Sequence, residues 1–97
     1  MIPTDWHKTV NRLKREMPTD LPVTVRTAKR IKDCHGWCDK RNGRYLVVIE
    51  QAEPYVMFMV LCHEYAHLFD WHNGIKEHSE SWGCWFARAY QVVFETE

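Results

Sequence analysis

The segment His63-Glu64-Tyr65-Ala66-His67 contains the residues whose types and spacing best suit chemistry. In an α-helix four residues rotate the chain by about 400°, so the two imidazoles project from one face, one turn apart. At that separation both can bind a single Zn²⁺ through nitrogens about 2.0–2.1 Å from the ion. Glu64 is rotated from His63 by about 100°, which places its carboxylate within reach of a water on that ion. The pattern predicts a metal-dependent hydrolase with Glu64 as general base.

A third protein ligand must come from outside this segment, because catalytic zinc usually takes three. Four downstream side chains are candidates: His72, Glu77, His78 and Glu80. His72 falls on the opposite face of the same helix, so it could join only if the helix breaks before it. His78 follows Gly74, which lets the chain turn back, and could complete a tetrahedral site from across the cleft. Glu77 and Glu80 remain alternatives, since carboxylates serve as third ligands in some zinc enzymes.

Two histidines one turn apart could also cap a helix end or face solvent without binding a metal. The eight residues before them, Tyr55 to Cys62, are all apolar, which indicates a helix that is at least half buried. Two imidazoles and a carboxylate in such a place need polar partners, because unpaired buried polar groups are costly. A metal ion supplies such a partner.

The pattern before the motif predicts one helix and three strands. Asn42-Gly43 favours a type I′ turn and therefore a hairpin between the last two strands. Tyr45 to Ile49 is apolar at nearly every position, which is typical of the most buried strand. The expected ranges are about 5–16 for the helix, with Thr4 as its cap, and about 23–26, 34–40 and 44–50 for the strands.

The motif itself lies on a helix expected from Pro54 to about Trp71 or His72, ending at Asn73-Gly74. Its first half is apolar on every face, so we expect it to be buried on all sides. Ser79 can cap a last helix, whose core stripe is expected to be Trp82, Trp85, Phe86, Ala89 and Val93. The expected fold class is α+β, with an N-terminal helix, a small three-stranded sheet with a hairpin, a central helix that carries the motif, and a C-terminal helix.

Composition sets further limits. With 97 residues, 45% of them hydrophobic, we expect one domain over residues 1–97 with a packed core. The longest apolar run has eight residues where a membrane span needs about 20, and the N-terminus lacks the apolar region of a signal peptide, so a cytoplasmic location is expected. The chain is also expected to be a monomer. Residues 1–50 hold 11 basic and 6 acidic side chains, but the net charge is zero. A nucleic-acid partner is not favoured, because such binders are normally basic overall.

The four cysteines are expected to be reduced thiols. Cys34 and Cys38 have the look of half a structural zinc site, but no second Cys/Cys or His/His pair has a fitting spacing. Cys62 and Cys84 lie in apolar helical patterns and are expected to be buried as small hydrophobes. A nucleic-acid-binding zinc module built on Cys34 and Cys38 is the least favoured function.

The motif, its spacer and the segment His78-Ser-Glu-Ser-Trp82, followed by Phe86 and Tyr90, resemble the SprT-like metallopeptidase superfamily, especially its short single-domain members from phages and bacteria. The resemblance covers about residues 45–94. It implies a minimal zincin-like fold, one Zn²⁺ per chain held by His63, His67 and His78, Glu64 as general base and acid, and a peptide or protein substrate. It also implies a cytoplasmic location, in the host if the chain is phage-encoded.

The alternative function is a catalytically weak, zinc-bearing module that docks a host or self protein. A peptide substrate could add to the sheet as an extra strand, with 34–40 or 44–50 as the natural choice. Supporting roles are also open: Asp70 could orient a ligand imidazole. Candidates for stabilising an oxyanion are His72, Arg88 and Tyr90, and Trp37 and Trp71 could line the cleft but are expected to pack.

Overall fold

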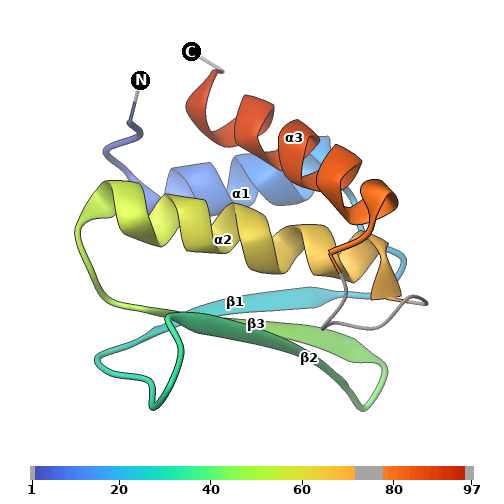
Figure 1. Cartoon of the computed structure of the whole chain (residues 1–97), viewed down its shortest axis with the longest axis horizontal. Helices are drawn as coiled ribbons and strands as arrows, with labels where there is room; N and C mark the ends of the chain where they lie inside the picture. Colours follow the sequence, from blue (N-terminus) through green and yellow to red (C-terminus); the bar gives the residue numbers. More distant parts are fainter. Residues whose placement is uncertain (1, 72–77, 96–97) are drawn as a thin grey trace.

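The structure is a computed structural model that describes residues 2–71 and 78–95. Three helices lie on one side of a three-stranded sheet, and α2 lies between the sheet and the other two helices (Figure 1). The elements in chain order are α1 (Trp6–Glu16), β1 (Val23–Ala28), β2 (Gly36–Arg41), β3 (Arg44–Glu50), α2 (Pro54–Phe69) and α3 (Glu80–Phe94). The α+β fold class and the order of one helix, three strands and two helices are confirmed.

Helix α1 begins one residue later than predicted, with Asp5 rather than Thr4 as its cap. The Asp5 carboxylate accepts a hydrogen bond from the Lys8 backbone N–H at 3.0 Å, which satisfies a free donor of the first turn. Arg12, on the same helix, donates from its guanidinium to two backbone carbonyls in the last turn of α3, at 3.2 Å to Val92 and 3.4 Å to Val93. These bonds fix α1 against the C-terminal end of α3.

The sheet has the order β1-β3-β2, with β1 parallel and β2 antiparallel to β3. The central position of β3 explains its apolar run, because it is paired on both edges and covered by α2 on one face. Asn42 and Gly43 have φ angles of 53° and 72°, so the predicted type I′ hairpin is confirmed. Strand β1 extends two residues beyond the predicted end. Strands β1 and β2 are the edges of the sheet.

Helix α2 ends at Phe69, with Asp70 as its C-cap, so the predicted end at Trp71 or His72 was two to three residues late. His72, Asn73 and Gly74 lie outside the described residues. The prediction of burial on all sides was wrong for one strip. Tyr55 is 44% exposed, and Met59 and Val60 are half-buried, because this strip lies between α3 and the edge strand β2. None of the described helices is long and apolar enough for a membrane crossing.

Helix α3 has Ser79 as its N-cap, as predicted: the hydroxyl accepts from the Trp82 backbone N–H at 3.1 Å. Ala89 is fully buried, but Trp85 is 36% exposed and stacks on Phe69 at the surface, with ring centroids 4.4 Å apart. The predicted burial of Cys84 is also wrong, because five residues before Ala89 correspond to about 500°, which puts the thiol on the opposite side. Cys62, in contrast, is fully buried as predicted, and so is Val93.

Candidate metal centre

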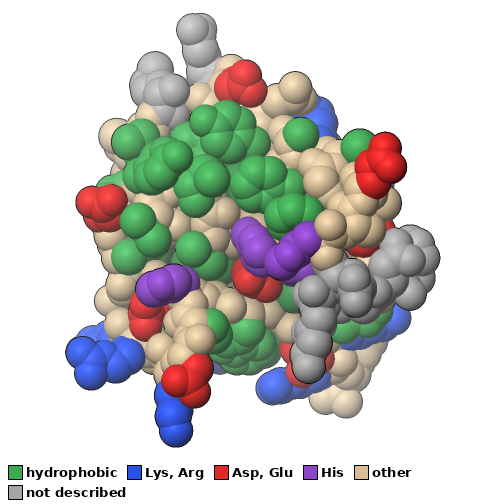
Figure 2. Space-filling view, in the orientation of Figure 1, with side chains coloured by type: hydrophobic (Ala, Val, Ile, Leu, Met, Phe, Trp, Pro, Cys, Tyr) green, Lys and Arg blue, Asp and Glu red, His purple; other side chains and the backbone are tan. Residues whose placement is uncertain are grey.

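Three imidazoles lie close together at the C-terminal half of α2. His63 and His67 lie one turn apart on α2, and His78 lies just before the N-cap of α3. The Nε2 atom of His63 is 3.4 Å from Nε2 of His67 and 3.3 Å from Nε2 of His78. One nitrogen from each ring lies within 4.8 Å of the others, so these residues can hold a metal ion. Figure 2 shows histidines at the surface beside an apolar patch.

Two of the nitrogen separations match the edge of a tetrahedral zinc site. With nitrogens about 2.0–2.1 Å from zinc, the edge of the tetrahedron is about 3.3–3.4 Å. The two distances from His63 Nε2 equal this edge. Hydrogen bonds between the rings cannot explain both contacts, since an imidazole nitrogen has one lone pair and accepts one N–H. The three residues could instead hold a metal ion, with the remaining pair of ligand nitrogens, on His67 and His78, within 4.8 Å of each other.

The burial of two of the rings favours the neutral form that binds metals. Burial, and then the neighbouring His78, lowers the pKa of His63 below its usual value. Burial lowers the pKa of His67 to about 4, with His63 and His78 adding to the effect and Asp70 opposing it. Both rings are therefore neutral at pH 7, with their nitrogen lone pairs available to a cation. The buried Nδ1 of His67 has no hydrogen-bond partner in the part of the chain that the structure describes.

Glu64 turns from the histidines toward the sheet, yet one oxygen stays close to the ligand atoms. Its Oε2 lies 3.8 Å from His63 Nε2, and its side chain is only 12% exposed. Burial raises the pKa of this carboxyl, while a hydrogen bond from the Cys38 thiol opposes the shift. The carboxylate is thus a base with few water contacts, next to the point where the three imidazoles meet.

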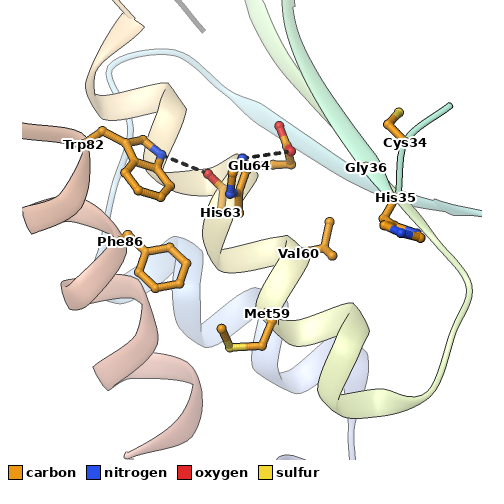
Figure 3. Close-up of a pocket in the computed structure, with 9 residues that line it drawn as sticks. All are labelled: Cys34, His35, Gly36, Met59, Val60, His63, Glu64, Trp82 and Phe86. Carbon is orange, nitrogen blue, oxygen red and sulfur yellow. Dashed lines mark hydrogen bonds and ion pairs between the residues drawn. The ribbon is translucent and has the colours of Figure 1, made fainter. Parts of the chain in front are cut away.

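Trp82 fixes the orientation of the cluster. Its indole N–H donates to the main-chain carbonyl of His63 at 3.3 Å (Figure 3). Its ring packs against all three imidazoles, with centroid distances of 5.2 Å to His63, 5.6 Å to His67 and 4.5 Å to His78. The aromatic residue four positions after His78 therefore forms the wall that holds the ligand rings. This contact gives the His-x-x-x-Trp spacing a structural reason.

Asp70, the C-cap of α2, lies close enough to His67 for its charge to act on that imidazole. It is 1% exposed, and its Oδ2 accepts a hydrogen bond from the Ser79 hydroxyl at 2.6 Å. Sequence reasoning missed this pair, since nothing in the spacing of Asp70 and Ser79 indicates that they meet. The contact joins the end of α2 to the start of α3, beside His78. It therefore ties the third imidazole to the helix that carries the other two.

A pocket of about 520 Å³ opens beside His63 and Glu64 (Figure 3). One wall comes from α2 through Met59 and Val60, another from α3 through Trp82 and Phe86, and the third from the chain that enters β2. Most of its surface is apolar. The remaining lining residues are Cys34, His35 and Gly36. The strip of α2 that the sequence predicted to be buried therefore lines this pocket.

Several other candidate residues lie away from the three histidines or outside the description. Glu80 is exposed in the first turn of α3, and it belongs to no group of three potential ligands among residues 2–71 and 78–95. The same holds for Cys34 and Cys38. Arg88 and Tyr90 do not line the pocket, and Tyr90 packs on Phe94.

His72 and Glu77 lie outside the described residues. Trp71 packs on Tyr45, and Trp37 lies under the Arg41 guanidinium.

Neither a family model, nor a curated protein, nor a solved structure matches this chain. The resemblance to SprT-like metallopeptidases therefore stays a prediction from the spacing of the motif residues.

Proposed function

We propose that this chain is a zinc-dependent peptidase whose ligands are His63, His67 and His78. The observation that carries the proposal is the pair of 3.3–3.4 Å separations between imidazole nitrogens, with the Glu64 carboxylate 3.8 Å from the shared His63 Nε2. Three imidazole ligands leave a fourth tetrahedral position open, which is the pattern of catalytic rather than structural zinc. Zinc in this place supplies a Lewis acid that lowers the pKa of a water and polarises a carbonyl.

Glu64 is the proton carrier in this proposal. Its raised pKa brings the carboxyl closer to neutral pH, where a general base is most effective. The carboxylate takes a proton from the attacking water and returns it to the nitrogen of the leaving amine. Its position on α2, directly after a ligand, fixes it relative to the reacting atoms without a flexible loop.

The substrate class follows from the surroundings of the site. Of the two strands that the sequence offered for adding a peptide, β3 is central and has no free edge, so β2 takes this role. The apolar pocket between Met59, Val60 and Phe86 adjoins both the site and the start of β2. We propose that it receives an apolar side chain next to the cleaved bond, while the main chain of the substrate pairs with β2.

Glu64→Gln separates a peptidase from the docking module. The amide keeps the volume but cannot accept a proton, so we expect hydrolysis of an unfolded protein substrate to fall by about 10²–10⁴-fold. The zinc content, measured by metal analysis, stays near that of the wild-type chain. Glu80→Gln is the matched control, because Glu80 is an exposed carboxylate at the start of α3, and its activity should be unchanged.

Two outcomes would contradict the proposal. Equal hydrolysis by Glu64→Gln and wild type would exclude Glu64 as the base. A wild-type chain that binds zinc and hydrolyses no member of a peptide library would favour the docking module instead.

A further inference from the structure

The outer face of the sheet carries a pocket lined by three arginines. The three helices lie together on the other face, where α2 also carries the ligands of the metal centre (Figure 1). The pocket on the outer face has a volume of about 330 Å³. Its lining residues are Thr24, Arg26, Arg41, Asn42, Arg44 and Leu46. None of these residues is acidic, and none belongs to the metal centre.

The register of the sheet brings these side chains together. Residues two positions apart on a strand share one face, so Thr24 and Arg26 of β1 project on the same side, as do Arg44 and Leu46 of β3. Thr24 is paired with Leu46, and Arg41 of β2 is paired with Arg44 across the hairpin. The three strands therefore each contribute one guanidinium to the same surface.

This arrangement of charges disfavours the folded chain unless an anion is present. Arg41 and Arg44 lie directly opposite each other on antiparallel strands, where like charges are destabilising. Asp39 offsets part of the repulsion, because its Oδ2 accepts a hydrogen bond from Arg41 Nε at 2.6 Å. Within residues 2–71 and 78–95, neither Arg26 nor Arg44 forms an ion pair. Three guanidiniums and one carboxylate leave a net charge of +2.

Two of the guanidiniums are held in place and still have N–H groups to offer. Arg41 lies over the Trp37 ring, with Cζ 5.4 Å from the ring centroid, and is bonded to Asp39 through Nε. Arg44 donates from Nη1 to the Thr24 hydroxyl at 2.9 Å. Because a guanidinium has five N–H donors, both arginines keep several for a ligand. Side chains that are already oriented also lose less entropy when a ligand binds.

The donors and the charge fit a phosphate monoester. Guanidinium groups bind phosphate through two parallel hydrogen bonds. A monoester has three strong acceptor oxygens and a charge of about −1.5 to −2 at pH 7, which matches the net charge of the pocket. A carboxylate has only two oxygens and a single charge. A nucleic-acid strand binds along an extended basic groove rather than in one pocket.

We propose that this pocket is a binding site for a small phosphate monoester. Arg26, Arg41 and Arg44 bind the phosphate oxygens, and Leu46 contacts the organic group. The volume of about 330 Å³ is at the lower end of the range for small-molecule sites, which suits a phosphate with a small organic group. The inference does not depend on the proposed peptidase function, because the two sites share no residue.

The test is a titration of the full-length chain with phenyl phosphate. Metal is removed beforehand so that zinc cannot bind the phosphate, and the amide NMR spectrum verifies that the chain remains folded. Calorimetry gives the Kd, and the amide shifts locate the ligand. We expect the shifts to change in β1 and in the hairpin of β2 and β3, and to stay constant around His63.

Variants of the pocket test which groups bind. Arg26→Gln and Arg44→Gln should each raise the Kd by about tenfold or more, because each removes charge-assisted hydrogen bonds. Arg44→Lys keeps the charge but loses the planar fork, so it should recover only a part of this loss. Arg88→Gln is the matched control, since it removes the same charge from an exposed position on α3. Its Kd should stay within about twofold of the wild-type value.

Four outcomes would overturn the proposal. They are no binding of phenyl phosphate at millimolar concentration, an unchanged Kd in both Gln variants, a Kd for phenylacetate equal to that for phenyl phosphate, and binding of an oligonucleotide without terminal phosphates in place of phenyl phosphate. The last result would make this face a nucleic-acid surface. All four leave the peptidase proposal standing, because neither zinc nor hydrolysis enters the measurement.

Discussion

The Ser79 hydroxyl donates a 2.6 Å hydrogen bond to the buried carboxylate of Asp70, and the same hydroxyl accepts from the backbone N–H of Trp82. One side chain thus caps α3 and attaches it to the end of α2. Because His78 directly precedes Ser79, this attachment fixes the position of the His78 backbone, from which the third imidazole extends. This hydrogen bond therefore supports the position of the third imidazole.

Ser79→Ala should weaken zinc binding without touching a ligand. Removing the cap lowers the free energy of unfolding by about 1–2 kcal/mol, and the loss of the bond to Asp70 loosens His78 relative to His63. We expect the Kd for zinc to rise by about tenfold, a typical effect of removing a partner behind a metal ligand. Asp5→Ala is the control, since it removes the cap of α1 at a comparable cost in stability. Equal zinc affinities in the two variants would show that the Asp70 bond does not support the site.

Zinc should stabilise the folded chain, and His78→Ala should abolish the effect. At a free zinc concentration 100 times Kd, binding adds about 2.7 kcal/mol, which raises Tm by roughly 10–20 °C in a domain of this size. His78 is exposed, so its loss leaves the core intact, and thermal unfolding with and without zinc measures the effect. His35→Ala is the control, because His35 is exposed and paired with Glu50 at 3.1 Å. A zinc-induced shift that persists in His78→Ala would remove this residue from the ligand set.

The metal-free chain should lose stability as the pH falls from about 6.5 to 4. The pKa of His67 is about 4 in the folded state against 6.5 in the unfolded state. The unfolded state therefore binds the proton first, and the free energy of unfolding falls through this window. Glu64, whose pKa burial raises, acts with opposite sign, so the measurement is made in the Glu64→Gln background.

The test of this pH dependence is urea unfolding across the window. In Glu64→Gln the decline should be clear, and in the double variant with His67→Gln it should be smaller. Parallel curves for the two variants would show that His67 is not the buried neutral group.

Apolar side chains next to the cleaved bond should be preferred, and Phe86→Ala should weaken the preference. Burial of an apolar side chain in such a pocket is worth about 10–200-fold in kcat/KM for each methylene that fits. We expect peptides with leucine or phenylalanine to be cleaved at least tenfold faster than serine peptides. Trp85→Ala is the control, because this ring stacks on Phe69 outside the pocket. If Trp85→Ala loses the preference for apolar side chains and Phe86→Ala keeps it, the substrate side chain does not bind in this pocket.

Local elements of this chain could be predicted because their rules act over a few residues. The 3.6-residue period puts His63 and His67 on one face of a helix wherever that helix packs. Asn42-Gly43 adopts the positive φ angles of a type I′ turn for steric reasons that involve only these two residues. The run from Tyr45 to Ile49 identified the most buried strand, because an apolar run is favoured where a strand is covered on most sides.

Predictions failed where the outcome depended on which faces meet. The apolar first half of α2 indicated full burial, but α3 and β2 leave a strip around Met59 open, and this strip became the pocket. Trp85 fits a helical core stripe by its spacing, yet Phe69 covers it at the surface. An apolar side chain at helical spacing looks the same in the sequence whether a neighbouring element covers it or leaves it exposed, so the spacing cannot predict which occurs.

The sequence by itself determined that two imidazoles project from one face of a helix, with a carboxylate directly after the first of them, because the helical backbone repeats a fixed geometry. Only the tertiary structure decided that His78 returns to within 3.3 Å of His63, and that Asp70 and Ser79 join the helices behind it. The physical reason is distance along the chain. These contacts join residues on different elements. Their geometry depends on how the helices and the sheet pack together, which the spacing of residues along the sequence does not determine.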